Sequence, residues 1–323
     1  MRLHRLDVAA LALAAVAGCH SQTAAPSRDW QKYPAVVTLT GAGEIDVLGD
    51  LHGDFEVTTR VLSSAGLITT SAPRHWTGGT RTLIVTGDVI DKGSAATQII
   101  DLLIALEPEA EAAGGRLVVT LGNHEAEFVA DPTSDKVKDF RDELSATLGL
   151  DPDTVAAGET KYGAWLYQRP IAAQVDDWFF CHGGNTNGMK ASKIDQTFRD
   201  RFAGRAVPDF GHPFVTGDSS LLEASAWWMG SDPLLPIDLN LAPLAAAHLV
   251  FGHDPGELDF PGDPLGNRAA GEMVTRYGGR LFLIDVGMSY AVGYSNGALL
   301  RIDRGPDSAT AVYPDGSERK LWP

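Results

Sequence analysis

The sequence predicts an α/β fold, because short β-branched runs alternate with helical stretches along the chain. Five of these runs end in a glycine next to polar residues, and each is interpreted as a buried strand followed by a loop. The strands are expected at 45–48, 82–86, 117–121, 178–181 and 249–251, with a helix over 94–113. Because α/β sheets place their sites at the carboxyl ends of strands, the five loops can converge on one rim.

The rest of the chain divides into late strands and two irregular segments. Runs at 280–286, 298–303 and 310–313 are interpreted as strands that close a second sheet. Residues 126–168 and 187–235 lack the strand–helix rhythm, and each segment directly follows one of the five loops. These segments are candidates for caps that shape a substrate pocket, with ordinary surface insertions as the alternative.

The composition of the chain limits the classes of protein to which it can belong. The chain has 323 residues, of which 44% are hydrophobic, so it can bury a large core in one domain or two smaller ones. A formal net charge of −16 repels nucleic-acid phosphates, so nucleic acid is not an expected partner. Cys19 and Cys181 are the only cysteines, which excludes a disulfide framework.

Residues 1–18 have the pattern of an export signal. A short basic start precedes an apolar run that is about half the length of a membrane-spanning helix. Val-Ala-Gly-Cys at 16–19 resembles the lipobox of bacterial lipoproteins, which makes Cys19 the expected lipidation site. A plain cleaved signal peptide or a frayed helix is the alternative.

The export signal predicts where the protein works and how it is attached. Residues 19–43 are interpreted as a tether, and 44–323 as the folded domain. The expected location is the periplasmic face of a membrane, reached only through the lipid anchor, or otherwise the periplasm or the medium. Because His20 rather than Asp follows Cys19, the outer membrane is the favoured destination.

The loops after the five strands contain the residue types of a metal centre. Four of the nine histidines lie in them, together with several Asp residues and one Asn. Carboxylate, amide and imidazole donors suit Mn, Fe or Zn. A single Asp-x-His loop is more often a helix cap or a surface turn, but five such clusters in succession indicate a functional site.

These loops resemble the motifs of the calcineurin-like metallophosphoesterases, within them the phosphoprotein phosphatases, and most closely the Shewanella-like branch. The motifs are Gly-Asp-Leu-His-Gly at 49–53, Gly-Asp-Val-Ile-Asp-Lys-Gly at 87–93, Gly-Asn-His-Glu at 122–125, His-Gly-Gly at 182–184 and Gly-His at 252–253. The resemblance extends over 44–303. It implies a sandwich of two mixed β-sheets flanked by helices, and a phosphatase that uses two divalent metal ions (Mn, Fe or Zn).

The resemblance also implies a role for each matching residue. The metal ligands would be Asp50 and His52 on the first metal, Asp88 bridging both, and Asn123, His182 and His253 completing the second. A water activated between the two cations would be the nucleophile. His124 would protonate the leaving oxygen, and Asp91 would orient it, with the N-cap of a helix near Ser94 as the alternative for Asp91. Lys92 and Asn123 are expected to contact the substrate phosphate.

Two positions depart from the family pattern. Lys92 stands where arginine is common, and keeps the charge without the bidentate fork. Met229 aligns with the arginine of a Trp-Tyr-Arg-Gly segment, so a phosphate contact is lost unless another arginine replaces it. The candidates for that replacement are Arg169, Arg199, Arg201 and Arg205.

Several other residues receive lesser roles. Trp227 and Trp228 are interpreted as core residues or an aromatic wall, and Asp285 as a supporting residue at a strand end. The residues not expected to be ligands or nucleophiles are His75, His212, His248 and Cys181.

Three functions follow from these observations. The first is a phosphatase acting on phosphoproteins or small phosphomonoesters. The second is a phosphodiesterase or dinucleoside polyphosphate hydrolase of the same superfamily, which the loss of arginine at Met229 keeps open. The third is a non-catalytic metal- or phosphopeptide-binding lipoprotein. Retention of His124 argues against the third, because a binding module has no need of a general acid.

Overall fold

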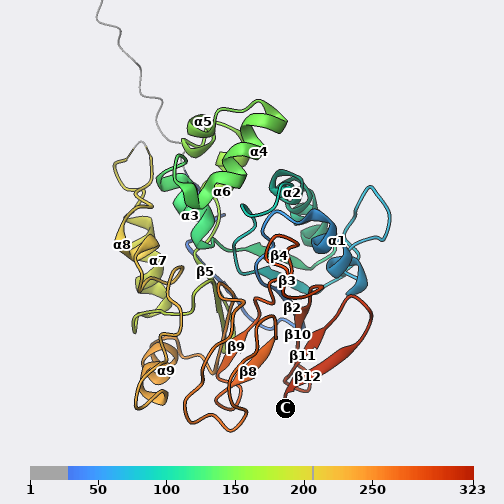
Figure 1. The fold of residues 1–323 in the computed structure, drawn as a ribbon, viewed down its shortest axis with the longest axis vertical. Coiled ribbons are helices and arrows are strands. Elements are labelled where there is room, and N and C mark those ends of the chain that lie inside the picture. Colours follow the sequence, from blue (N-terminus) through green and yellow to red (C-terminus); the bar gives the residue numbers. More distant parts are fainter. Residues whose placement is uncertain (1–27, 206) are drawn as a thin grey trace, which may run out of the picture.

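A computed structural model describes residues 28–205 and 207–323 as two six-stranded mixed sheets with helices around them (Figure 1). The expected α/β sandwich of two mixed sheets flanked by helices is therefore confirmed. The signal segment 1–18 and Cys19 lie outside the described residues.

The first sheet has the strand order β1-β5-β6-β7-β9-β8. Its strands are β1 (Val36–Leu39), β5 (Ala172–Val175), β6 (Trp178–Cys181), β7 (His248–Phe251), β9 (Leu281–Leu283) and β8 (Val274–Arg276). Strands β6, β7 and β9 run parallel, and their residues are buried, as expected for strands covered on both faces. The carboxyl ends of β6 and β7 therefore lie side by side.

The second sheet has the order β12-β11-β10-β2-β3-β4. Its strands are β12 (Glu318–Trp322), β11 (Ser308–Val312), β10 (Leu299–Asp303), β2 (Glu44–Leu48), β3 (Thr82–Val85) and β4 (Arg116–Val119). Strands β2, β3 and β4 are parallel and in step, with Leu48 opposite Val85. Three of the five predicted loops therefore leave this sheet at one edge, and the other two leave the first sheet.

The late strands do not all join the second sheet as the sequence predicts. Strand β9 pairs with β7 in the first sheet, whereas β10 and β11 extend the second sheet beside β2. The two sheets meet through aromatic side chains: the ring of Trp322 on β12 lies 4.5 Å from that of His248 on β7. Strand pairing is a long-range property, so the hydrophobic run at 280–286 alone does not determine its sheet.

Helices make the remaining regular structure. They are α1 (Phe55–Ser64), α2 (Ala96–Ala112), α3 (Asn123–Ala130), α4 (Lys138–Leu148), α5 (Pro152–Ala156), α6 (Lys161–Tyr167), α7 (Ala191–Arg199), α8 (Pro213–Thr216) and α9 (Leu234–Leu241), with 3₁₀ turns η1 (Asp135–Val137) and η2 (Ala242–Leu244). In the part of the chain that the structure describes, none of these helices has the length and hydropathy to cross a membrane.

The two irregular segments are mainly helical and contact each other. Helices α4, α5 and α6 belong to 126–168, and α7 and α8 to 187–235; Figure 1 shows the first three at the top of the view and the other two on the left side. Lys136 of the first segment lies 3.7 Å from the carboxylate of Glu223 in the second. The two segments therefore support one another beside the site loops.

Residues 28–43, the described part of the expected tether, belong to the domain. Strand β1 pairs with β5 in parallel. Arg28 holds the segment before it, because its guanidinium lies 4.5 Å from the centre of the Trp30 ring. That group also donates hydrogen bonds of 2.8–2.9 Å to the carbonyl oxygens of Tyr33, Pro34, Tyr167 and Arg169. A flexible tether therefore cannot include residues 28–43.

Candidate metal centre and active site

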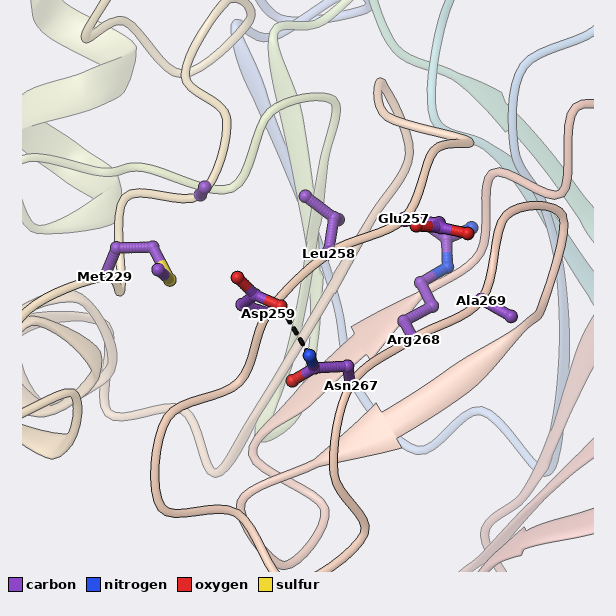
Figure 2. A pocket seen from close by; sticks show the side chains of 8 residues that line it. Met229, Glu257, Leu258, Asp259, Asn267, Arg268 and Ala269 are labelled. Carbon is purple, nitrogen blue, oxygen red and sulfur yellow. Dashed lines mark hydrogen bonds between the residues drawn. The ribbon is translucent and has the colours of Figure 1, made fainter.

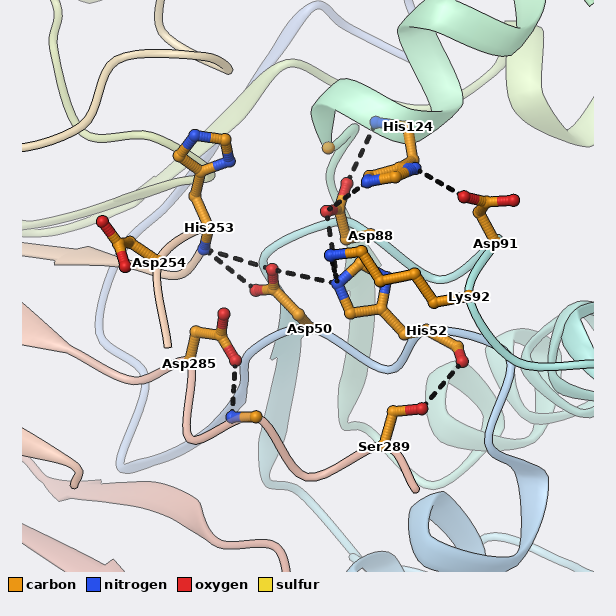
Figure 3. A network of polar contacts seen from close by, with 12 residues as sticks. Asp50, His52, Asp88, Asp91, Lys92, His124, His253, Asp254, Asp285 and Ser289 are labelled. Atoms are coloured by element: carbon orange, nitrogen blue, oxygen red, sulfur yellow. Dashed lines mark hydrogen bonds and ion pairs between the residues drawn. The ribbon is translucent and has the colours of Figure 1, made fainter. Parts of the chain in front are cut away.

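The five predicted loops converge on one buried cluster of polar side chains (Figure 3). Asp88 lies at its middle, with Oδ2 at 3.4 Å from His182 Nε2 and 3.7 Å from His52 Nε2. The backbone N–H of His253 donates to Asp50, and His253 Nδ1 lies 3.2 Å from His182 Nε2. Five of the six residues expected as metal ligands thus meet, although they come from two sheets.

The backbone at these loops leaves no room for larger residues. A Cβ on Gly252 would lie 2.2 Å from Asp50 Oδ1, and one on Gly122 would lie 2.1 Å from Asp88 Oδ1. His52 and Asp88 themselves adopt positive φ angles of 42° and 49°. Such conformations cost about 1–3 kcal/mol each and are found where the surroundings enforce them, as at functional sites.

Donor atoms in this cluster are close enough for two cations that share one carboxylate. The carboxylate of Asp88 belongs to two groups whose donor atoms lie within 4.8 Å of one another. One group is completed by His52 and His124, and the other by Asp50 and His182. Asp88 therefore occupies the position expected of a bridging ligand.

The Asn123 and His182 side chains fit a cation between them. His182 Nδ1 donates to the carbonyl oxygen of Thr86 at 2.9 Å, so Nε2 is the ring nitrogen that faces the cluster. Asn123 Oδ1 lies 2.9 Å from that Nε2, and its other neighbours, on Asp88 and His253, are acceptors as well. A divalent cation bound between them would be a common partner for Asn123 Oδ1 and His182 Nε2.

The pKa values of the site residues also favour a bound cation. Burial and the nearby carboxylate of Asp285 raise the pKa of Asp50 well above its usual value. Burial alone would lower the pKa of His182, but the carboxylates of Asp88 and Asp50 outweigh it and raise that pKa to about 10. Burial lowers the pKa of His52 to about 3 and that of His253 to about 4, so both rings are neutral and able to bind metal.

His124 pairs with Asp91, as the resemblance implies. His124 Nδ1 lies 3.1 Å from Asp91 Oδ2, and its Nε2 lies 3.9 Å from Asp88. Burial would lower the pKa of His124, but the carboxylates of Asp88 and Asp91 hold it above the usual value. The imidazole of His124 thus lies beside Asp88, and the two carboxylates favour its protonated form.

The alternative role of Asp91, as N-cap of the helix near Ser94, is wrong. Its Oδ1 accepts hydrogen bonds from the backbone of Asp139 and Phe140 and so caps α4. The first N–H groups of α2 are instead accepted by Glu143, a buried residue of α4. Asp91 therefore joins His124 to the segment 126–168.

Glu125 is a buried residue for which the sequence analysis predicted no role. Its carboxylate accepts four backbone N–H groups, from Asp88, Val89, Ile90 and Gly122, at 2.7–3.0 Å. These groups belong to the loops after β3 and β4. The GNHE motif at 122–125 was the available signal, but a buried carboxylate that binds only backbone has no sequence pattern of its own.

Lys92 lies between the candidate metal ligands and an open groove. Its Nζ lies 3.0 Å from His52 Nε2. The groove, of about 1080 Å³, runs from Lys92 between the start of α1 and residues 288–296. Ser289 lines this groove and donates to the carbonyl oxygen of His52, and the neighbouring Tyr290 is 93% exposed. The groove can therefore hold a group attached to a phosphate at the metal cluster.

None of the four candidate arginines reaches the site loops in the described contacts. Each makes an ion pair elsewhere: Arg169 with Glu107, Arg199 with Asp195, and Arg201 and Arg205 with Asp209. Met229 is 47% exposed and lines a separate pocket of about 620 Å³ with Glu257, Asp259 and Arg268 (Figure 2). Lys92 is thus the predicted phosphate-binding cation that lies at the cluster.

The remaining residues singled out in the sequence have structural surroundings. Trp228 is buried and stacks on Phe260, while Trp227 donates to the carbonyl oxygen of Gly183. His75 pairs with Glu109, His212 caps α8, and His248 stacks on Trp178. Burial raises the pKa of the Cys181 thiol to about 12, so this thiol is protonated and unreactive.

The fold and the cluster of candidate metal ligands define a class of protein, the metallophosphoesterases. Residues 43–257 match the family model described as calcineurin-like phosphoesterase, and the chain belongs to that family. It is therefore a hydrolase of phosphoric esters. Members of the family depend on a binuclear metal centre, and the described residues contain suitable groups of ligands.

Relatives of this chain include phosphatases of the Shewanella-like group. An uncharacterized protein of Schizosaccharomyces pombe is 27% identical over 87% of this chain and 82% of its own length. The Arabidopsis thaliana Shewanella-like protein phosphatase 2 is 44% identical over 24% of this chain and 19% of its own length. A cold-active protein-tyrosine phosphatase of a psychrophilic Shewanella shares the fold with a TM-score of 0.71 and 18% identity, over 89% of this chain and 83% of that one.

Proposed function

We propose that this protein is a phosphatase that hydrolyses phosphomonoesters, of phosphoproteins or small molecules, at a centre of two divalent cations. The cations, Mn, Fe or Zn, would be held by Asp50, His52, Asp88, Asn123, His182 and His253. The observation that carries the proposal is the shared position of Asp88 between two groups of ligands, next to the His124–Asp91 pair. The two cations, when bound, would supply charge neutralisation and an activated water.

The chain's own groups account for the rest of the reaction. Asp91 holds His124 in place and helps to keep it protonated, so the imidazolium can give its proton to the leaving oxygen. Lys92 is placed to bind a phosphoryl oxygen as a point charge. The groove beside Lys92 receives the leaving group. The name of the similar Shewanella enzyme makes phosphotyrosine proteins one substrate class to test.

A phosphodiesterase is the second candidate. It is favoured by Met229, which stands where an arginine would recognise the extra charge of a monoester, and by the four candidate arginines that pair elsewhere. A non-catalytic binding protein is disfavoured, because the pairing of His124 with Asp91 favours the protonated imidazole, which suits a general acid and cannot bind metal.

Hydrolysis of two model compounds tests the proposal. The purified protein would be assayed with p-nitrophenyl phosphate and with bis-p-nitrophenyl phosphate, after addition of Mn²⁺ or Zn²⁺. The Asp88→Asn variant should lose turnover, whereas Asp101→Asn, which removes an exposed carboxylate paired with Lys161, should keep it. Turnover of the monoester supports a phosphatase, turnover of the diester alone supports the alternative, and turnover of neither with metal bound supports a binding protein.

We also propose that the protein is exported and attached to a membrane through a lipid on Cys19. The support is the sequence pattern at 1–19, because these residues lie outside the structure's described ranges. Labelling with radioactive palmitate should mark the wild type and not a Cys19→Ala variant. Labelling of neither, with a cleaved N-terminus, would indicate an ordinary signal peptide.

A further inference from the structure

Asp285 has a buried carboxylate oxygen with no hydrogen-bond partner. The residue follows β9 and is 1% exposed. Its Oδ1 accepts the backbone N–H of Gly287 at 2.8 Å, whereas Oδ2 has no partner within the described chain. A charged oxygen taken out of water without a partner costs several kcal/mol. Something beyond these side chains must therefore compensate for its charge.

The carboxylate of Asp285 lies beside that of Asp50. A Cβ on Gly49 would be 3.1 Å from the Cα of Asp285, so the backbone before Asp50 packs directly on the end of β9. Of all charged groups, Asp285 has the largest electrostatic effect on Asp50. Figure 3 shows the free oxygen of Asp285 directed toward Asp50 and the other metal ligands. Two buried carboxyl groups thus face the same small region.

No lysine or arginine in the described part of the chain forms an ion pair with the carboxyl group of Asp50 or Asp285. The closest candidate, Arg268, is fully buried, but its guanidinium donates to the backbone oxygens of Asp254, Asp285 and Glu272. Those bonds join the loop that carries His253 to the end of β9. Arg268 therefore fixes the position of Asp285 and leaves its carboxylate free.

A structural role for Asp285 requires only one of its two oxygens. The hydrogen bond to Gly287 could be made equally well by an asparagine, without the repulsion from Asp50. The second oxygen and the negative charge are explained only by a partner with positive charge. The first half of the metal centre has three expected protein ligands, against four in the second half.

We infer that Asp285 is a further acidic residue of the metal centre, which acts with Asp50 to hold the first of the two divalent cations. This inference rests on the two-metal centre of the proposed function. It predicts that removing the charge weakens metal binding while relieving repulsion in the metal-free protein.

The test is metal binding by Asp285→Asn, with Asp46→Asn as the matched control. Asp46 is also fully buried, but it forms ion pairs of 3.0 Å with Arg81 and Arg301. Mn²⁺ binding to EDTA-treated protein would be measured by calorimetry at pH 7.5, with melting temperatures before and after addition. Asp285→Asn should raise one Mn²⁺ dissociation constant about 10–100-fold and leave the metal-free melting temperature unchanged or higher. Asp46→Asn should lower that melting temperature and leave Mn²⁺ affinity unchanged.

The contrary outcomes are distinct. Wild-type Mn²⁺ affinity in Asp285→Asn, or a lower melting temperature of that variant without metal, would overturn the role of Asp285 and leave the proposed function intact. Asp285→Ser is a second variant that keeps an acceptor for the N–H of Gly287. If neither Asp285→Asn nor Asp285→Ser folds, the fold itself needs the carboxylate, and the inference is also overturned. A wild-type protein that binds no Mn²⁺ would instead overturn the two-metal centre.

Discussion

Glu125 is the residue whose replacement should most clearly separate loop positioning from general stability. Its two oxygens each accept two backbone N–H groups from the loops that carry Asp88 and Asn123. In Glu125→Gln the amide oxygen can serve one pair, but the amide nitrogen faces the other pair as a donor. Hydrogen bonds to a charged group are worth about 1.5–3 kcal/mol each, so losing two costs roughly 3–6 kcal/mol.

This loss should be measurable as both stability and metal affinity. For a domain of this size about 2 °C corresponds to 1 kcal/mol, so the melting temperature should fall by roughly 6–12 °C. Because the freed N–H groups hold the loop of Asp88, Mn²⁺ affinity and turnover should fall as well. Thermal unfolding with EDTA and calorimetric titration with Mn²⁺ would measure the two effects separately.

Glu143→Gln is the matched control for this prediction. Glu143 is also buried and accepts the N–H groups of Ala96 and Thr97, but it holds the start of α2 and no metal ligand. It should lower the melting temperature to a similar extent while leaving Mn²⁺ affinity unchanged. Equal changes in Mn²⁺ affinity for the two variants, or an unchanged melting temperature in Glu125→Gln, would refute the reasoning.

Three further predictions concern the general acid, the phosphate contact and the N-terminal segment. Asp91 helps to raise the pKa of His124, so turnover that needs the His124 proton should decline as the pH rises through the pKa of His124. Asp91→Asn should move this decline in kcat to lower pH. An alkaline limb of the kcat profile at the same pH in both proteins would contradict this. Lys92→Met should raise the KM for p-nitrophenyl phosphate about tenfold, because a charged contact to the phosphate is lost. Elemental analysis should still find two metal ions per chain. An unchanged KM would show that the phosphate does not contact Lys92. Arg28→Ala should destabilise the fold by about 2–4 kcal/mol, measured by urea unfolding, without changing kcat/KM. Wild-type stability would show that Arg28 does not hold the segment before β1.

Much of the site could be predicted because its signals are local. Each ligand follows a short hydrophobic strand within a few residues, and parallel strands such as β2 and β3 end at one edge of their sheet. The order Asp50, Asp88, Asn123 along the chain therefore predicts their proximity in space. The loops of His182 and His253 follow the parallel strands β6 and β7 in the same way, and the structure places these residues in the same cluster although the strands belong to another sheet.

What the sequence did not predict depends on long-range contacts. Whether 280–286 joins one sheet or the other is decided by which strand edge it meets, and not by its own hydrophobicity. Asp91 satisfies the start of α4, some 48 residues later, because the folded chain brings that helix to it. The membership of β1 in the first sheet likewise depends on β5, which is far away in sequence.

The division between short loops and long segments has an evolutionary consequence. The metal ligands stand directly at strand ends, where glycine backbones and buried carboxylates leave no freedom to change. The segments 126–168 and 187–235 branch off just beyond those positions and are mainly helical. Lineages can therefore lengthen, shorten or recharge these segments and acquire new substrates while inheriting the reaction chemistry intact.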